Sequence, residues 1–272
     1  MDTNNLNSNG VTLYVYGTVY NNNNLCTKSI ESLDKIRHNK IFLIVDNYST
    51  DGTFEKLNLL MPKYDISIKR VKCSRGKGKQ LAMEMAYDRS NDKDFFMYFD
   101  LDTIYSAEFA IYVDYFIDNI DMYKNNIFLN QLCQKQINFK IPWRNLNNAE
   151  EWERIAHCIS SGYNVLYIPS NVSIGINEDW KHGSREKRYA TGYSYLKRQM
   201  RNVVDLFRGW NISSYRRLQQ YFIYVKPNKK HKFFLFLVLI YVKVFYSMYG
   251  YSIDINILYA YEHFKLLNLE PE

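Results

Sequence analysis

The sequence predicts an α/β protein: an α/β/α sandwich around a mostly parallel sheet, followed by a helical C-terminal extension. Short apolar runs typical of buried strands alternate with amphipathic helical patterns, which is the order of parallel βαβ units. The 272 residues are 47% hydrophobic and 23% charged, enough for a packed core and inconsistent with general disorder. We expect a disordered lead-in (1–10), an α/β domain (11–180) and a basic, aromatic extension (181–272).

Two βα units open the chain. Residues 11–16 are β-prone and stop at Gly17, and residues 25–36 place apolar side chains on one helical face. Residues 41–45 form a continuous apolar run, typical of a strand buried on both faces, which ends at Asp46. A turn rich in Asn, Ser, Asp and Gly leads to the next helix.

The next two units follow the same order. Residues 66–71 are the third expected strand, and the basic, glycine-containing segment 75–79 precedes a clear helical pattern at 80–89. The fourth strand is predicted at 95–99 and the next helix at 107–120. The sequence therefore predicts four parallel strands whose carboxyl ends share one edge of the sheet, where such folds bind ligands.

Beyond these units the pattern loosens. We expect a helix at 150–159 and a short strand at 165–168. In the extension, helical patterns occur at 195–207 and 215–225, ahead of the apolar segment 233–242.

Two carboxylates directly follow the fourth strand. Asp100 and Asp102 are one residue apart, so an extended chain points both to the same side. Carboxylate oxygens are the ligands that hard divalent cations prefer. Together with the acidic turn after Asp46, the pair places acidic groups at one sheet edge. The alternative is that both carboxylates cap the following helix.

Charge and cysteine usage suggest partners and a compartment. The net charge of +7 and the pI near 9.0 fit an anionic partner, although solvated lysines explain an excess of this size equally well. No secretory signal is recognisable, and the cysteines are widely spaced, so we expect free thiols in a reducing, cytoplasmic compartment. These are Cys26, Cys73, Cys133 and Cys158.

Over about residues 11–169 the order of motifs resembles the GT-A fold of family 2 glycosyltransferases. Four segments carry the resemblance: Gly17-Thr18-Val19-Tyr20-Asn21, the Ser-Thr-Asp-Gly-Thr turn within 45–53, Phe99-Asp100-Leu101-Asp102, and Ala149-Glu150-Glu151-Trp152-Glu153-Arg154. The resemblance implies that 11–180 is a nucleotide-sugar-binding and catalytic domain. It also implies a nucleotide-sugar donor and a glycan or lipid-linked acceptor.

For the nucleotide side, the resemblance implies contacts from Thr18 and Tyr20, and from Asp46 to the base. A carboxylate at the end of a buried strand can accept hydrogen bonds from a base or ribose. We expect Asp51 to build the turn and cap the next helix instead. Lys79, at an expected helix N-terminus, is a candidate nucleotide contact; the alternative is a solvated basic turn.

For the diphosphate, the resemblance implies Mg2+ or Mn2+ on Asp102, with Asp100 orienting the ribose or completing the metal shell through water. A bridging cation stabilises the charge on the leaving diphosphate. His182 and Arg185 resemble a mobile loop that closes on the diphosphate, where His182 would join the metal shell. A basic surface run is the alternative.

Glu151 occupies the place of the family's catalytic aspartate, with Glu instead of Asp. A carboxylate there takes the proton from the acceptor hydroxyl, and one displacement inverts the anomeric configuration. Glu150 serves equally well if the alignment is off by one residue. The alternative is that both only favour the helix N-terminus electrostatically.

The segment 229–252 combines a lysine cluster with ten apolar residues, half of what a spanning helix needs. It fits a peripheral contact with an anionic membrane surface, a buried helix or a span. Two other functions stay open: a nucleotidyltransferase of similar fold, and a non-enzymatic basic nucleic-acid-binding protein. A nucleotidyltransferase would need a glycine-rich loop with an early Arg or Lys directly after the first strand, and residues 17–21 carry no such charge. The second leaves the acidic edge unexplained because carboxylates repel phosphates, so nucleic acid is not an expected partner.

Overall fold

The computed structural model describes residues 10–128, 131–147, 150–169, 174–176, 196–197, 199–201, 203–204, 229–245, 264–267 and 269. The predicted helix at 215–225 and nearly all of the lead-in lie outside these residues. The described residues between 196 and 204 are helical, as expected for that segment.

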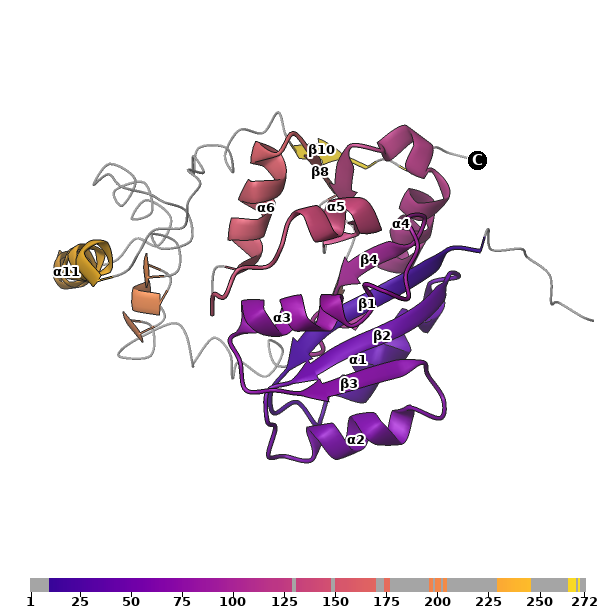
Figure 1. Cartoon of the computed structure of the whole chain (residues 1–272), viewed down its shortest axis with the longest axis horizontal. Helices are drawn as coiled ribbons and strands as arrows, with labels where there is room; N and C mark the ends of the chain where they lie inside the picture. Colours follow the sequence, from indigo (N-terminus) through magenta and orange to yellow (C-terminus); the bar gives the residue numbers. More distant parts are fainter. Residues whose placement is uncertain are drawn as a thin grey trace, which may run out of the picture.

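A five-stranded sheet forms the centre of the α/β part, with the order β3-β2-β1-β4-β7 (Figure 1). Four strands are parallel, and β7 is antiparallel to β4. The bounds are β1 (Thr12–Val19), β2 (Asn39–Asp46), β3 (Ile66–Arg70), β4 (Phe95–Tyr98) and β7 (Cys133–Gln134). The mostly parallel α/β fold predicted from the sequence is confirmed.

Helices cover both faces of this sheet. Along β1, Leu13 and Val15 join a core cluster that includes residues of α1, α2 and α4. Tyr14 and Tyr16 point to the other face, where α3 packs, because side chains alternate along a strand (Figure 1). The helices are α1 (Cys26–Ser32), α2 (Thr53–Leu60), α3 (Arg75–Glu84), α4 (Ala107–Asp118) and α5 (Lys135–Lys140), with 3-10 turns η1 (Leu33–Lys35) and η2 (Ile120–Tyr123).

Two predicted boundaries were wrong. Gly17 does not end the first strand but lies inside β1, and a Cβ there would come within 2.6 Å of the Phe99 carbonyl oxygen. The third helix begins at Arg75 rather than at residue 80. The Ser74 hydroxyl accepts a hydrogen bond from the Lys77 backbone N–H at 3.1 Å and caps the helix. Lys79 therefore lies within α3 and not at its N-terminus.

Further short strands complete the fold; of these, the sequence pattern predicted only the strand at 165–168, which the structure shows as β8. A second, three-stranded parallel sheet has the order β10-β8-β6, and β5 and β9 form an antiparallel pair. Their bounds are β5 (Ile104–Tyr105), β6 (Asn126–Phe128), β8 (Asn164–Tyr167), β9 (Gly175–Ile176) and β10 (Phe264–Leu266). Although β10 belongs to the expected extension, Leu267 after it is buried in the core of the α/β part.

Helix α6 (Glu150–Ser160) is held by a buried arginine. The Arg154 guanidinium donates to the backbone carbonyl of Ile141 at 2.9 Å, to Gln131 Oε1 at 2.6 Å, and to Asn138 Oδ1 at 2.6 Å. It also donates to the Tyr16 hydroxyl at 3.1 Å. These bonds tie α6 to the sheet and to α5, and so fix the position of its first turn.

Helix α11 (Lys229–Phe245) carries the lysine cluster and the apolar segment. Leu235, Val238 and Leu239 are buried. Several large apolar side chains of the same helix are exposed: Phe233, Phe234, Leu237, Ile240, Tyr241 and Val244. Within the described part of the chain, no helix has the length and apolar character needed to cross a bilayer.

Candidate active site

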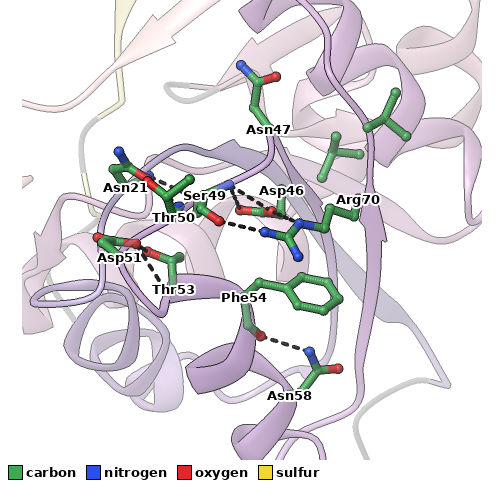
Figure 2. A network of polar contacts seen from close by, with 12 residues as sticks. Asn21, Asp46, Asn47, Ser49, Thr50, Asp51, Thr53, Phe54, Asn58 and Arg70 are labelled. Carbon is green, nitrogen blue, oxygen red and sulfur yellow. Dashed lines mark hydrogen bonds and ion pairs between the residues drawn. The ribbon is translucent and has the colours of Figure 1, made fainter.

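The turn after β2 gathers polar groups from three loops at the carboxyl end of the sheet. Figure 2 shows Asp46 between the backbone of Ser49 and the Arg70 guanidinium. Both Asp46 carboxylate oxygens accept from the Ser49 N–H, at 3.1 and 3.3 Å, and Arg70 Nε lies 3.1 Å from Oδ2. The Asp46 side chain has no exposed surface. A base could therefore reach this carboxylate only after the loop rearranges.

Arg70 is a site residue that the sequence analysis missed. It ends β3, and its Nη2 donates to the Ser49 carbonyl at 2.6 Å. The guanidinium lies 4.7 Å from the Phe54 ring centroid and 5.2 Å from that of Tyr48. One third of the Arg70 side chain is exposed, so its positive charge lies at the same sheet edge as the acidic turn. The available signal was a basic residue at the carboxyl end of a strand.

Asp51 builds the turn, as expected. Its carboxylate accepts from the Thr53 N–H at 3.1 Å and the Thr53 hydroxyl at 2.5 Å (Figure 2). It also accepts from the Asn23 N–H at 3.0 Å. Burial would raise the pKa of Asp51, but these hydrogen bonds outweigh it and lower the pKa. The predicted role in building the turn is thereby confirmed, whereas the N-cap position of α2 is Gly52 rather than Asp51.

The two predicted contacts after Gly17 differ in accessibility. Thr18 is half-buried, and its hydroxyl donates to the Val45 carbonyl at 3.1 Å. Tyr20 is 61% exposed at the end of β1. The structure thus presents an exposed aromatic ring at this edge, whereas the Thr18 hydroxyl is already bonded within the sheet.

The acidic pair lies where β4 ends. Asp100 is partly exposed, and its Oδ1 accepts a short hydrogen bond from the Tyr98 hydroxyl. Burial, and then the negative charge of Glu151, raise the pKa of Asp100. Asp102 is half-buried in the next turn. Among the described residues, no group of three or more His, Cys, Asp or Glu side chains is arranged to hold a metal ion. His182 and Arg185 lie outside the described residues.

The two glutamates begin α6 and meet Lys79 of α3. Lys79 Nζ donates to Glu151 Oε1 at 2.7 Å and to Glu150 Oε1 at 3.1 Å. The Glu150 side chain is 1% exposed, whereas that of Glu151 is 38% exposed. Of the two carboxylates, Glu151 is thus the accessible one. Lys79 itself is fully buried, so its observed contacts are with these glutamates.

Tyr98 connects Glu151 to Asp100. Its hydroxyl lies 2.9 Å from Glu151 Oε1 and is also bonded to Asp100. Arg75 approaches the same cluster, with Nε 3.4 Å from Glu150 Oε1 and Nη2 3.9 Å from Asp100 Oδ1. Tyr98 was not predicted, although it precedes Asp100 by two residues and so shares its side of the strand.

The charge of the cluster keeps Glu151 ionised. Burial would raise the pKa of Glu151, but the charge of Lys79 and its hydrogen bond, followed by Arg75 and the Tyr98 hydroxyl, lower it to about 2. The pKa of the Arg75 guanidinium is raised by the surrounding carboxylates, although burial acts against this. The site therefore contains a half-exposed, anionic carboxylate next to a pair of aspartates.

Comparison with protein families gives a match that covers just under half of the chain. The sequence pattern of the family described as Glycosyl transferase family 2 matches residues 15–148. No curated protein sequence matches the chain.

Solved structures with a similar fold share little sequence. Full-length TarS of S. aureus is 12% identical, with a TM-score of 0.50, and the match covers 87% of this chain and 44% of TarS. A TarS fragment, residues 1–349, is 13% identical with a TM-score of 0.49, covering 87% and 72% of the two chains. The mannosyltransferase PcManGT from Pyrobaculum calidifontis, solved with GDP-Man and Mn2+, is 15% identical with a TM-score of 0.49, covering 86% and 73%.

Proposed function

Residues 15–148 of this chain belong to glycosyl transferase family 2, and we propose that this glycosyltransferase inverts the anomeric configuration and uses a divalent metal and a carboxylate base. Its donor is a nucleotide sugar, and its acceptor is a hydroxyl of a glycan or a lipid-linked molecule. The single observation that carries the proposal is the link from Glu151 through the Tyr98 hydroxyl to Asp100, at the carboxyl edge of a parallel sheet.

The proposed reaction is one displacement. The acceptor hydroxyl gives its proton to the carboxylate base, and its oxygen forms a bond to the anomeric carbon. The bond from that carbon to the diphosphate oxygen breaks, and the electron pair leaves with the nucleoside diphosphate. Glu151 is proposed as the base because it is exposed and ionised, whereas Glu150 is buried against Lys79 and Arg75.

The acidic pair fits a divalent cation. Asp100 has a raised pKa because burial and the Glu151 charge disfavour its ionised form, and a cation would compensate this negative charge. We propose that Asp102 and Asp100 hold Mg2+ or Mn2+, that His182 joins the metal shell and that Arg185 contacts the diphosphate, both of these from outside the described residues. Such an ion, when bound, stabilises the charge that develops on the leaving diphosphate.

The nucleotide is proposed to lie along the ends of β1, β2 and β3. Tyr20 offers an exposed ring for the base, and Thr18 and Asp46 line the same edge. Arg70, one third exposed beside Asp46, adds a positive charge toward the anionic donor. A nucleotidyltransferase and a nucleic-acid-binding protein are less well supported, because the family match and the acidic edge both favour sugar transfer.

A thermal-shift screen followed by a transfer assay tests this function. The full chain would be heated with UDP, GDP and their sugar conjugates, with and without Mn2+. We expect at least one nucleotide to raise the melting temperature in a Mn2+-dependent way, because ligands that bind the folded state stabilise it. That conjugate should then release nucleoside diphosphate when acceptors are added. No metal-dependent shift and no release with any donor would overturn the proposal.

A further inference from the structure

Two carboxylates and two aromatic rings surround the buried ammonium group of Lys79. Its Nζ contacts Glu150 and Glu151 at 3.1 and 2.7 Å, and it lies 3.7 Å from the Tyr98 ring centroid and 4.6 Å from that of Trp143. A buried ammonium is stable only when it is paired, and aromatic faces add to the pairing. These contacts account for the full burial of this lysine.

The contacts on Glu151 are one-sided. Lys79 Nζ and the Tyr98 hydroxyl both donate to Oε1 of Glu151, and neither of these two hydrogen bonds involves Oε2. The side chain is nevertheless 38% exposed. One carboxylate oxygen is therefore anchored inside the protein, which leaves the other for a group that approaches from solvent.

We propose that Lys79 is a positioning residue for the base: by holding Oε1 of Glu151, it directs Oε2 toward the acceptor hydroxyl. This inference rests on the proposed function, in which Glu151 takes the proton. It also assigns Lys79 a role different from a nucleotide contact, because its charge is directed at the glutamates.

The titratable groups around Glu151 come from several elements. Lys79 and Arg75 belong to α3, Tyr98 to β4, Asp100 to the turn after β4, and Tyr105 to β5. Loss of the Lys79 charge removes the largest influence that lowers the pKa of Glu151. The Lys79→Met variant should therefore show a Glu151 pKa that rises toward its ordinary value.

The first test compares transfer kinetics of the full chain with those of Lys79→Met, using the nucleotide sugar that gives the fastest turnover. We expect kcat to fall about 100-fold, as for a misplaced catalytic group, with the donor KM changed less than threefold. The acid limb of the pH profile of kcat should move to higher pH. Lys63→Met, at an exposed lysine beyond α2, is the matched control and should leave kcat and the pH profile unchanged.

Two outcomes would overturn the proposal. A Lys79→Met variant with unchanged kcat would show that the anchor is dispensable. A selective rise in donor KM, with kcat preserved, would show that Lys79 acts on the nucleotide. Because the glutamates are left without their buried cation, Lys79→Met could fold poorly. Lys79→Met with Glu150→Gln also removes the charge of the buried Glu150 and is expected to show the same loss of kcat.

A second readout needs no substrate. Carboxyl carbon NMR of glutamate-labelled protein, assigned with Glu151→Gln, follows the ionisation of Glu151 between pH 2 and 7. We expect Glu151 to stay ionised down to lower pH in the parent protein than in Lys79→Met. Equal titration curves would overturn the Lys79 contact even if transfer occurs. A shifted curve in a protein that transfers no sugar would instead refute only the proposed function.

Discussion

At the scale of single residues, the hydroxyl of Tyr98 is shared between two carboxylates. The Tyr98 hydroxyl is within bonding distance of Asp100 and of Glu151, yet it can donate to only one of them at a time. Loss of negative charge at Asp100, as metal binding would cause, favours donation to Glu151. In the proposed function, metal binding at Asp100 and the hydrogen bonding of Glu151 are therefore coupled through the Tyr98 side chain.

Asp102→Asn tests the metal assignment. If Asp102 is a direct ligand, the variant should lose Mn2+-dependent binding of the nucleoside diphosphate while its circular dichroism spectrum stays unchanged. Even outer-shell partners of a metal account for about 10–100-fold in affinity, so we expect a loss of about 100-fold or more. Isothermal titration calorimetry with Mn2+ measures it. Asp121→Asn, at an exposed aspartate in η2, is the control, and equal affinity in Asp102→Asn would exclude this ligand.

Glu151→Gln tests the base. The substitution keeps the size of the side chain and removes the proton acceptor, so donor affinity should persist while the transfer rate falls by roughly 100-fold or more. Glu150→Gln should retain more activity, since Glu150 is buried, and Glu55→Gln on α2 should behave like the parent. If Glu150→Gln is the inactive variant, the two roles are exchanged. If both variants keep full rates, this pair is structural.

The sequence located the candidate site at this scale only in part. The acidic residues stand out because each follows an apolar strand or begins a helix, and those are local patterns. Lys79 pairs with residues of α6 far along the chain, so its burial follows from tertiary packing that no local pattern encodes. The same holds for the Arg70–Asp46 pair, which joins two different strands.

At the scale of elements, α6 depends on Arg154. Arg154→Leu would remove the donor to buried acceptors on Gln131 and Ile141, and one of the donors to Asn138 Oδ1. Each unpaired buried group is costly, so we expect the free energy of unfolding to fall by about 2–4 kcal/mol. Urea denaturation followed by fluorescence measures this change, with Arg89→Leu at an exposed arginine as the control. A loss no larger than that of the control would show that α6 is held by other contacts.

Helix α11 is proposed to bind an anionic membrane surface. It exposes Lys229, Lys230 and Lys232 together with an apolar face. We expect the full chain to sediment with vesicles rich in phosphatidylserine and to be released by salt, because exposed charges are screened within about 8 Å at physiological ionic strength. Liposome co-sedimentation at low and high salt measures this binding.

Point substitutions are the appropriate variants for this test, because a chain ending before α11 would also lack β10. Leu237→Glu with Val244→Glu should abolish sedimentation, whereas Leu59→Glu on the exposed side of α2 should not. Equal sedimentation of both variants would refute binding through this face. Sedimentation that salt does not weaken would refute the electrostatic part.

Element boundaries were predictable where the sequence pattern is local, and not elsewhere. Gly76 and Gly78 disfavour a helix by propensity, yet they lie inside α3. Packing requires them: a Cβ on Gly76 would overlap the Arg144 carbonyl oxygen, and one on Gly78 would lie 2.8 Å from the Thr18 hydroxyl. Strands of two or three residues, such as β5 and β9, have too few residues for an alternation to be recognised.

At the scale of the whole molecule, the predicted alternation of strands and helices was sufficient for the fold class but not for the arrangement of strands. The central order β3-β2-β1-β4 follows from parallel βαβ connections. The antiparallel edge strand β7 and the separate sheet β10-β8-β6 depend on pairings between distant segments, for which the sequence shows no signal.

The position of β10 has a consequence for the rate at which this protein folds. Phe264 pairs with Val165, so this sheet closes a far longer loop than the one between β1 and β2. Non-local pairing slows folding because the entropy of loop closure is lost before the contacts form. We expect β10 to be the last strand to gain protection in pulsed hydrogen exchange, after a native-like β1–β4 core. Refolding should therefore pass through a state in which the β8 edge is open.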